Sequence, residues 1–578
     1  MQWTLKPSPD PNIVKHLEEA LNIPEKNAYL LAQRGIRTFE DARQFFKPEL
    51  SNLHDPFLMK NMTEAVNRIE QAIKNNEKIL VYGDYDVDGT TAVSIVYSYL
   101  KDIYEHVDSY IPDRYSEGYG VSIQGIEYAA ENNFSLIIAL DCGTKATDKI
   151  AYARQKNIDF IVGDHHTPGE TLPPAVAFLN PKQSGCPYPY KELSGAGIGF
   201  KLIQAIQQHR QAPLEDIIHY LDLVAVSIGA DIVPITGENR VMAYYGLKQI
   251  EINPRPGLRA LSRNVKDKTL DISDLVFTLA PRINAAGRIK HGKEAVKLLI
   301  EKDNAVAIRF ADEIEVYNQD RREFDQQITI EALKQIIENN EETHYTSVVY
   351  DPNWHKGVLG IVASRLIETY YRPTVVFTKS NGVLSGSVRS VSGFNVYDAL
   401  QACSEHILQF GGHKYAAGLT IAEEQYEAFK AKFETVVKNT ITENSRTPEI
   451  KIDAKLSFKD LIPVKGEELP KFFRILKRMA PFGPGNMNPV FLTEGVNDTG
   501  YSKTVGKNNK HLRLSVKDFK SGRSLNGIAF NMGDKFDLVH SGVPLAIVYT
   551  LEENHWNGKV SLQMRIKDIK PLINLKQS

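Results

Sequence analysis

The chain has 578 residues, more than one hydrophobic core supports, so about two to four domains are expected. Its formal net charge of −2 gives no whole-chain electrostatic argument for binding nucleic acid. The cysteines Cys142, Cys186 and Cys403 are widely spaced, which argues against a disulfide framework and a cysteine zinc site. No apolar stretch is long enough to cross a bilayer and the N-terminus has no signal core, so we expect a cytoplasmic protein.

The first part of the chain is expected to be helical and the next part α/β. Residues 1–54 form a helical segment by the spacing of their apolar side chains, and nothing in them suggests chemistry. From residue 55 to residue 270, strand and helix patterns alternate, which is typical of a parallel sheet covered by helices. The expected strands are Ile79–Tyr82, Leu136–Leu140 and Phe160–Val162.

Each of these three strands is followed by acidic or histidine side chains. The loops read Asp84-Tyr-Asp-Val-Asp-Gly, Asp141-Cys-Gly and Asp164-His-His. A fourth acid, Asp231, follows an apolar segment that we expect to be a helix. Because the carboxyl ends of parallel strands meet at one edge of a sheet, these loops can converge. Taken alone, the first loop is equally consistent with a solvated acidic turn, and the histidine pair alone favours a capped turn at the end of a strand. The four converging loops reverse that preference.

The combined set of side chains predicts a centre for two divalent ions bridged by one carboxylate. Oxygen and imidazole ligands favour Mn²⁺ or Mg²⁺. Such ions can lower the pKa of a bridging water and clamp a phosphoryl oxygen, so the expected reaction is phosphoester hydrolysis. The candidate residues are Asp84, Asp86, Asp88, Asp141, Asp164, His165, His166 and Asp231.

The rest of the chain predicts three further parts. Residues 271–340 are charged and helical, as in a connector made of one long helix or a helix pair. Residues 341–440 show a second, smaller α/β pattern. Residues 450–578 carry short strand patterns, typical of a small barrel or sandwich. From residue 501 onward there are 13 lysines and arginines against 6 aspartates and glutamates, so this part is expected to contact a polyanion, although a basic surface without function is the alternative.

Several motifs resemble the DHH phosphoesterase superfamily, and within it the bacterial 5′→3′ exonucleases specific for single-stranded DNA. Beside the aspartate loop and the Asp-His-His triplet, the motifs lie at residues 114–120, 194–200, 281–288, 354–365 and 411–418. The last is similar to the glycine-rich signature of the associated DHHA1 domain. The resemblance implies a parallel-sheet DHH domain, joined by a long helix to a smaller α/β DHHA1 domain and followed by a β-barrel, OB-fold-like domain.

The resemblance also implies roles for residues of the candidate metal centre. Asp141, as the bridge, and His165 and His166 would be the catalytic residues, with His166 as partner or general acid for the scissile phosphate. Smaller relatives carry a histidine shortly before the aspartate loop, where this chain has Val81-Tyr-Gly, so direct ligation by Asp84 is open. The implied metal ligands are Asp84, Asp86, Asp88, Asp141, His165 and Asp231.

A second group of residues is implied in binding the 5′-phosphate and the nucleic acid. The hydroxyl of Ser387 and the guanidinium of Arg389 suit a terminal phosphate. For an isolated arginine the alternative is a surface ion pair, and for the glycine-rich loop it is a tight turn. The implied contacts are Arg114, Arg288, Ser387, Arg389, Gly412 and His413. In the basic C-terminal part the candidates are Lys510, Arg513, Arg523, His555, Trp556 and Lys559.

The function implied is a metal-dependent exonuclease that releases mononucleotides from single-stranded DNA, in DNA repair and recombination. Expected partners are single-stranded DNA and, by the resemblance, a single-strand-binding protein and a helicase; a monomer without membrane contact is expected. Two alternatives stay open. One is a phosphodiesterase for short oligonucleotides or cyclic dinucleotides, and the other is an inactive scaffold that binds DNA.

Overall fold

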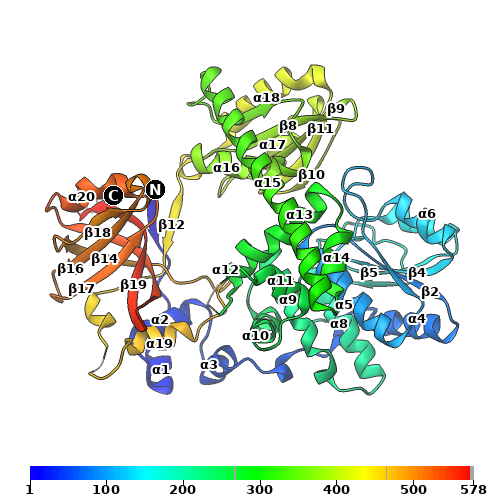
Figure 1. Ribbon diagram of the computed structural model, residues 1–578, viewed down its shortest axis with the longest axis horizontal. Helices are drawn as coiled ribbons and strands as arrows, with labels where there is room; N and C mark the ends of the chain where they lie inside the picture. Colours follow the sequence, from blue (N-terminus) through cyan, green and yellow to red (C-terminus); the bar gives the residue numbers. More distant parts are fainter. Residues whose placement is uncertain (266–268, 464, 573–578) are drawn as a thin grey trace. The chain divides into compact units, whose positions relative to one another are not determined.

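The computed structural model describes residues 1–265, 269–463 and 465–572, which form two compact units (Figure 1). The larger unit contains residues 54–233 and 237–448. The smaller unit contains residues 1–53, 234–236 and the chain from residue 449. Among the described residues, no helix combines the length and the apolar character that a membrane crossing requires.

The larger unit begins with a five-stranded sheet in which all strands are parallel, in the order β3-β2-β4-β5-β6. The three strands expected from the sequence lie within β2, β4 and β5, and β3 and β6 extend the sheet at its edges. The strands are β2 (Lys78–Gly83), β3 (Val107–Tyr110), β4 (Phe134–Leu140), β5 (Asp159–Gly163) and β6 (Ala177–Leu179). The helices of this parallel-sheet domain are α4 (Met62–Lys74), α5 (Val87–Ile103), α6 (Ile123–Glu131), α7 (Thr147–Gln155), α8 (Gly195–His209), α9 (Leu221–Ala230), α10 (Gly237–Ile252) and α11 (Pro256–Ser262).

Helices cover both faces of this sheet, which is why its strands are apolar along almost their whole length. On one face, Tyr82 and Phe160 pack in a cluster with Ile126 of α6 and Ile150 of α7. On the other face, α5 lies so close to β2 that a side chain at Gly83 would collide with Val93. Because both faces of the sheet are covered, a ligand can reach it at the loops that follow the carboxyl ends of the strands.

Helix α5 begins earlier than its sequence pattern indicates. The pattern of small and apolar residues starts after Gly89, but the helix begins at Val87. The reason is the side chain of Asp86, which accepts a hydrogen bond from the backbone N–H of Gly89 (3.1 Å) and caps the helix. Asp88 therefore lies in the first turn of α5 and not in a loop.

The second half of the larger unit is a helical connector and a mixed-sheet domain. The connector contains α12 (Ile272–Asp274), α13 (Ala280–Ile289), α14 (Lys293–Ile300) and α15 (Asn304–Glu338), and α15 is a single helix of 35 residues. The sheet has the order β10-β11-β9-β8-β7, in which only β7 and β8 are parallel. Its elements are β7 (Ser347–Tyr350), α16 (Leu359–Thr369), β8 (Thr374–Ser380), β9 (Val383–Arg389), α17 (Val396–Gln401), β10 (Gln409–His413), β11 (Ala416–Ile421) and α18 (Tyr426–Thr440).

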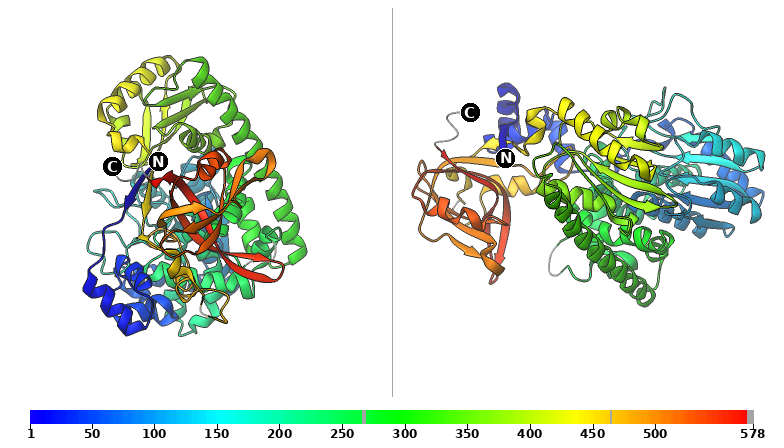
Figure 2. Two further views of the ribbon diagram at one scale, coloured as in Figure 1. Left: turned by 90° about the vertical axis from the view of Figure 1, so that its left-hand side faces the viewer. Right: turned by 90° about the horizontal axis from the view of Figure 1, so that it is seen from above.

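The smaller unit is built around a strongly curved sheet in the order β13-β14-β18-β19-β17-β16-β15 (Figure 2). An additional pairing of β14 with β16 closes five of the strands into a ring, as in an OB-fold. β13 and β15 extend beyond the ring, so the sheet is not a strict barrel. The elements are β12 (Glu449–Ile452), β13 (Ala454–Lys455), α19 (Lys471–Lys477), β14 (Phe491–Asp498), β15 (Lys503–Val505), β16 (His511–Asp518), β17 (Ser524–Ala529), α20 (Phe536–His540), β18 (Leu545–Trp556) and β19 (Lys559–Pro571).

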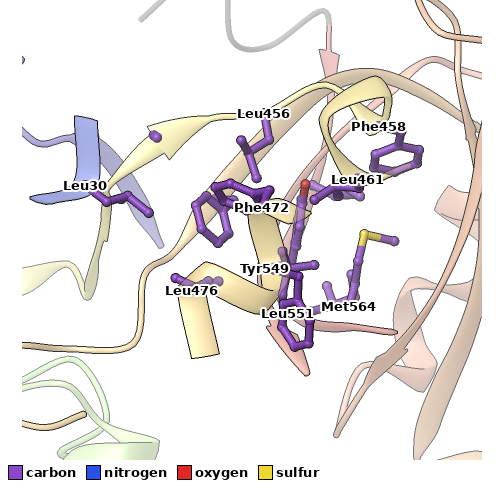
Figure 3. Close-up of a cluster of buried hydrophobic side chains, with 14 of the residues drawn as sticks. Leu30, Leu456, Phe458, Leu461, Phe472, Leu476, Tyr549, Leu551 and Met564 are labelled. Atoms are coloured by element: carbon purple, nitrogen blue, oxygen red, sulfur yellow. The ribbon is translucent and has the colours of Figure 1, made fainter. Parts of the chain in front are cut away.

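The N-terminal segment folds as part of this smaller unit. It forms β1 (Gln2–Leu5), α1 (Pro11–Leu21), α2 (Glu25–Gln33) and α3 (Phe39–Phe46). β1 pairs in parallel with β12, and the indole N–H of Trp3 donates to the carboxylate of Asp568 (2.9 Å). Leu30 of α2 is buried in one apolar cluster with Phe472 and Tyr549 (Figure 3). The N-terminal helices thus supply one wall of the core of the curved sheet.

Replacing Leu30 with alanine tests this shared core. The change removes buried apolar volume, so we expect the free energy of unfolding of the smaller unit to fall by about 2–5 kcal/mol. Hydrogen exchange at the amides of β16 and β18, measured by mass spectrometry, should become faster. Phe39→Ala is the control, because Phe39 is 53% exposed. Unchanged exchange in Leu30→Ala would show that the N-terminal helices do not support the ring.

Candidate active site

The acidic and histidine side chains that follow β2, β4 and β5 converge at one edge of the parallel sheet. His165 lies at the centre of the group. Its Nε2 atom is 3.2 Å from Asp141 Oδ1, 3.5 Å from Asp231 Oδ2 and 3.6 Å from Asp88 Oδ2. Ligand atoms of Asp88, His165 and Asp231 all lie within 4.8 Å of one another, as do those of Asp141, His165 and His166. Two overlapping groups that share His165 can hold metal ions.

Asp231 reaches the site as the sequence indicates. The apolar segment before it is helix α9, and Asp231 directly follows the last residue of that helix. It is more exposed than the other carboxylates of the group, which are almost fully buried.

Asp88 is held by the N-terminus of helix α8. Its carboxylate accepts hydrogen bonds from the backbone N–H groups of Gly195 (2.7 Å) and Ala196 (2.8 Å) and from the hydroxyl of Ser227 (2.6 Å). A helix N-terminus favours negative charge, so this arrangement stabilises the ionised carboxylate. A side chain at Gly195 would lie 2.6 Å from Asp141 Cβ, so the glycine makes room for the second carboxylate. The motif at residues 194–200 therefore places two of the candidate ligands.

The electrostatics of the buried carboxylates require positive charge. Burial and the neighbouring carboxylates raise the pKa of Asp84, Asp86 and Asp141. The same causes raise the pKa of Asp231 to about 8. Within the described part of the chain, Asp84 Oδ2 and Asp141 Oδ1 have no hydrogen-bond donor, although both atoms are buried. A divalent cation would satisfy these oxygens and allow the carboxylates to ionise together, so the residues fit Mn²⁺ or Mg²⁺.

Asp84 and Asp86 lie beside the two groups and outside both. The charge of Asp86 acts on Asp141 and Asp231, which places it within electrostatic reach of the centre. Asp84 is fully buried, and one of its oxygens accepts from the backbone N–H of Gly120 (3.2 Å). The direct ligation of Asp84 therefore stays a prediction, while its buried charge faces the same edge of the sheet.

Asp164 positions His166 and lies outside both groups. One of its oxygens contacts Nδ1 of His166 (2.7 Å) and accepts from the His166 backbone N–H (3.1 Å), and the other accepts from the N–H of Thr144 (2.9 Å). Burial alone would raise the pKa of Asp164, but these hydrogen bonds and His166 lower it. Burial opposes the charge of His166, yet the bond to Asp164 raises the pKa of His166 to about 9. Asp164 therefore favours the protonated form of His166, which is the form that can donate a proton.

Tyr119 is a residue that the sequence pattern does not single out. Its hydroxyl lies 3.4 Å from Nε2 of His166, the nitrogen that Asp164 leaves free. Its ring also meets the ring of Tyr85 edge-on, in the loop after β2. Tyr119 belongs to the motif at residues 114–120, and its role could have been found only from the fold of that segment.

His413, in the mixed-sheet domain, lies near the same centre. Burial and the positive charges of His166, Lys145 and Lys182 lower its pKa, so it lies within electrostatic reach of His166. The preceding Gly412 has a φ of +147°, and a side chain there would lie 2.4 Å from the carbonyl oxygen of Ala416. Only glycine allows the strand to approach in this way.

The arginines expected at a 5′-phosphate also come together. Burial and the charges of Arg114, Arg389 and Arg321 lower the pKa of Arg288 to about 9. Arg389 donates to the hydroxyl of Ser387 (3.4 Å), and Gly360 leaves room beneath both side chains. These like charges repel one another, and a bound anion would relieve that repulsion, so binding of a phosphate by Arg114, Arg288 and Arg389 stays a prediction.

The smaller unit presents a row of basic side chains across its curved sheet. In the strand register, Lys503 lies opposite Arg513, Arg513 opposite Ile528, and Ile528 opposite Arg565. The guanidinium of Arg565 lies over the ring of Phe530 (5.4 Å), so an aromatic ring accompanies the row. Of the residues expected here, Arg513 is in the row, whereas His555, Trp556 and Lys559 lie at the turn between β18 and β19. Lys503 and Arg565 were not expected, because only the register aligns them.

Comparisons with known proteins agree with this architecture. Family models match for the "DHH family, N-terminal domain" over residues 78–228, the "DHHA1 domain" over residues 342–439 and the "RecJ OB domain" over residues 452–568. The single-stranded-DNA-specific exonuclease RecJ of Bacillus subtilis is 36% identical over 575 residues, which cover 98% of this chain and 70% of that protein. The chain belongs to the RecJ family. The RecJ proteins of Haemophilus influenzae and Escherichia coli are 34% and 31% identical, covering 90% and 96% of this chain and 93% and 98% of their own.

Solved structures of the RecJ family show the same fold. The crystal structure of RecJ from Thermus thermophilus in complex with Mn²⁺ matches with a TM-score of 0.83 and 28% identity, covering 98% of this chain and 79% of that one. The complex of the same protein with Mg²⁺ matches with a TM-score of 0.77 over 99% and 78% of the two chains. The predicted fold class, a DHH domain, a DHHA1 domain and an OB-like domain, is confirmed.

Replacing Asp164 with asparagine tests the role of His166. The change keeps the size of the side chain but removes the charge that orients His166 and raises its pKa. We expect the single-turnover rate on a 5′-phosphorylated single strand to fall by about 10²-fold or more, because proton transfer is lost. Mn²⁺ binding, measured by electron paramagnetic resonance, should change little. Asp148→Asn, at an exposed aspartate of the same domain, is the control. An unchanged rate in Asp164→Asn would contradict this role.

Proposed function

We propose that this chain degrades single-stranded DNA from its 5′ end and releases mononucleotides by phosphodiester hydrolysis with two divalent cations. The observation that carries the proposal is the convergence of Asp88, Asp141 and Asp231 on His165, in a chain of the RecJ family. Metal-dependent exonuclease activity follows from that family membership, and DNA repair and recombination are the processes it serves.

The ligands of the two cations would come from the edge of the parallel sheet. Asp141 would be shared, because its buried Oδ1 has no other partner among the described residues and lies beside His165. When bound, Mn²⁺ or Mg²⁺ would neutralise the carboxylates, lower the pKa of a water and stabilise charge on the phosphate. The proposed ligands are Asp86, Asp88, Asp141, His165 and Asp231, with Asp84 as a buried charge next to them.

The protein's own acid–base chemistry would come from His166. Asp164 holds its Nδ1, so Nε2 is the atom that can donate a proton to a phosphate oxygen. The hydroxyl of Tyr119 lies 3.4 Å from the same nitrogen, so it would be next to a phosphate oxygen that receives the proton. This division gives each member of the Asp-His-His triplet a separate task.

The 5′→3′ polarity would come from the arginine cluster. A terminal phosphate carries more charge than an internal diester and offers more free oxygens, so three guanidinium groups and the Ser387 hydroxyl favour a strand end. The charge of Asp86 acts on Arg288, which places the cluster within electrostatic reach of the acidic centre. A 5′-phosphate bound there would lie close to the first diester bond.

The smaller unit would hold the strand without reading its sequence. Residues 452–568 match the RecJ OB domain, and the row of Lys503, Arg513 and Arg565 offers charges at sheet spacing. Phosphate contacts of this kind are independent of sequence. We further propose that the protein acts as a monomer in the cytoplasm, where a helicase and a single-strand-binding protein supply its substrate.

Digestion of end-labelled strands tests the function. A 5′-phosphorylated single strand with a 5′ label should release labelled mononucleotide at once, whereas the same strand with a 3′ label should give a ladder that shortens with time. Mn²⁺ or Mg²⁺ should support the reaction, and a chelator should stop it. Early release of the 3′ label would reverse the polarity, and faster cleavage of a dinucleotide than of the long strand would favour the phosphodiesterase alternative.

The Asp141→Ala variant tests the site in the same assay. Loss of the shared carboxylate should abolish cleavage while binding of single-stranded DNA, measured by fluorescence anisotropy, stays within about 3-fold, because affinity comes mainly from phosphate contacts. The control is Asp148→Asn, which should cleave as the unaltered chain does. Cleavage retained in Asp141→Ala would refute the assignment of Asp141.

A further inference from the structure

An aromatic stack stands next to the arginine cluster in the larger unit. The rings of Phe324, on α15, and His355 are almost parallel, with centroids 5.0 Å apart and an interplanar angle of 3°. Phe324 is 42% exposed, so part of its ring is accessible to a ligand. A half-exposed aromatic ring that stacks on one neighbour is suited to stack on a flat ligand as well.

The position of His355 is fixed by the residues that also fix Arg288. Its Nδ1 accepts from the backbone N–H of Gly357 (3.2 Å), and the ring of Tyr115 meets it edge-on. The carbonyl oxygen of Gly357 accepts from Arg288 Nη1 (3.0 Å), and Tyr115 donates through its hydroxyl to the carbonyl of Arg288. A side chain at Gly357 would lie 2.6 Å from that carbonyl oxygen, so the packing is tight. The stack and the guanidinium are therefore held in one fixed arrangement.

The electrostatics keep His355 a neutral ring. Burial and the positive charge of Arg114 lower its pKa. The charge of Arg114 also lowers the pKa of Arg288 and Arg389. The stack therefore lies within electrostatic reach of the same arginine that belongs to the cluster expected to hold the 5′-phosphate. A neutral imidazole adds no further charge there and leaves His355 to act through its flat surface.

We propose that the stack of Phe324 and His355 is the platform on which one of the first two nucleobases of the strand lies when its 5′-phosphate occupies the arginine cluster. The proposal rests on the proposed function, since it needs a 5′ end at that cluster. Every nucleobase has a flat π face, so such a platform holds the strand without selecting a sequence. It would orient the terminal nucleotide so that the bond that follows it is presented to the acidic centre.

Binding of abasic strands tests the proposal separately from catalysis. Anisotropy with 5′-phosphorylated single strands is measured in the presence of a chelator, so no cleavage is needed. The strands carry a single abasic site at position 1, 2 or 3. The unaltered chain should bind the strand that is abasic at position 1 or at position 2 about 5- to 100-fold more weakly than the intact strand, the range expected for one stacked base. Phe324→Ala should bind the intact and that abasic strand equally.

Two further variants separate stacking from simple packing. Phe324→Tyr keeps the ring and should retain the discrimination, whereas Phe324→Leu keeps apolar volume without a flat π face and should lose it. Ile330→Ala, at a 63% exposed residue of the same helix, is the matched control and should behave as the unaltered chain. Equal weakening of all strands by Phe324→Ala, or discrimination retained in Phe324→Leu, would overturn the proposal. A chain that discriminates in this way but does not degrade labelled strands would instead refute the proposed function.

Discussion

The larger unit depends on one constraint, the mutual repulsion of carboxylates buried at the edge of a parallel sheet. Asp84, Asp86, Asp88, Asp141 and Asp231 meet where three strands and one helix end. Burial makes the charges of Asp84, Asp88 and Asp141 especially costly, because these three side chains are almost completely shielded from water. Part of this cost is offset by the N-terminus of α8, which donates two backbone hydrogen bonds to Asp88. Bound cations would offset the rest of the repulsion among the carboxylates. The same cations would make this edge of the sheet a hydrolytic centre.

A second cluster of charged side chains is positive, and its charges also repel one another. Arg114, Arg288 and Arg389 repel one another as the carboxylates do, and they need an anion where the carboxylates need cations. In the proposed function, the 5′-phosphate of a strand would supply that anion and would bring a diester bond with it. The aromatic stack of Phe324 and His355 adds a neutral surface to the same arrangement. The cations would thus neutralise the carboxylates, and the phosphate of the substrate would neutralise the arginines.

Much of this could be predicted from the sequence because it follows local patterns. Apolar runs that end in Asp or Asp-His-His give the strands and the converging loops, and the apolar segment before Asp231 gives α9. Tertiary contacts gave the rest. The different roles of His165 in the metal centre and of Asp164 in positioning His166 follow from the direction of each side chain, which the sequence does not show. The hydrogen bonds that hold Asp88 come from α8, over a hundred residues away in the sequence. No local pattern shows that Leu30 and Tyr549 share one apolar cluster. Nor does it show the strand register that aligns Lys503 with Arg565.

The most direct test of the central claim is diffraction from crystals grown with Mn²⁺, recorded at the manganese absorption edge. Two anomalous peaks, about 3.5–4 Å apart, should lie on either side of the Asp141 carboxylate. One should also lie near His165 and the other near the loop that carries Asp86. A single peak, or peaks that do not touch Asp141, would contradict the account that two shared cations hold the buried carboxylates together.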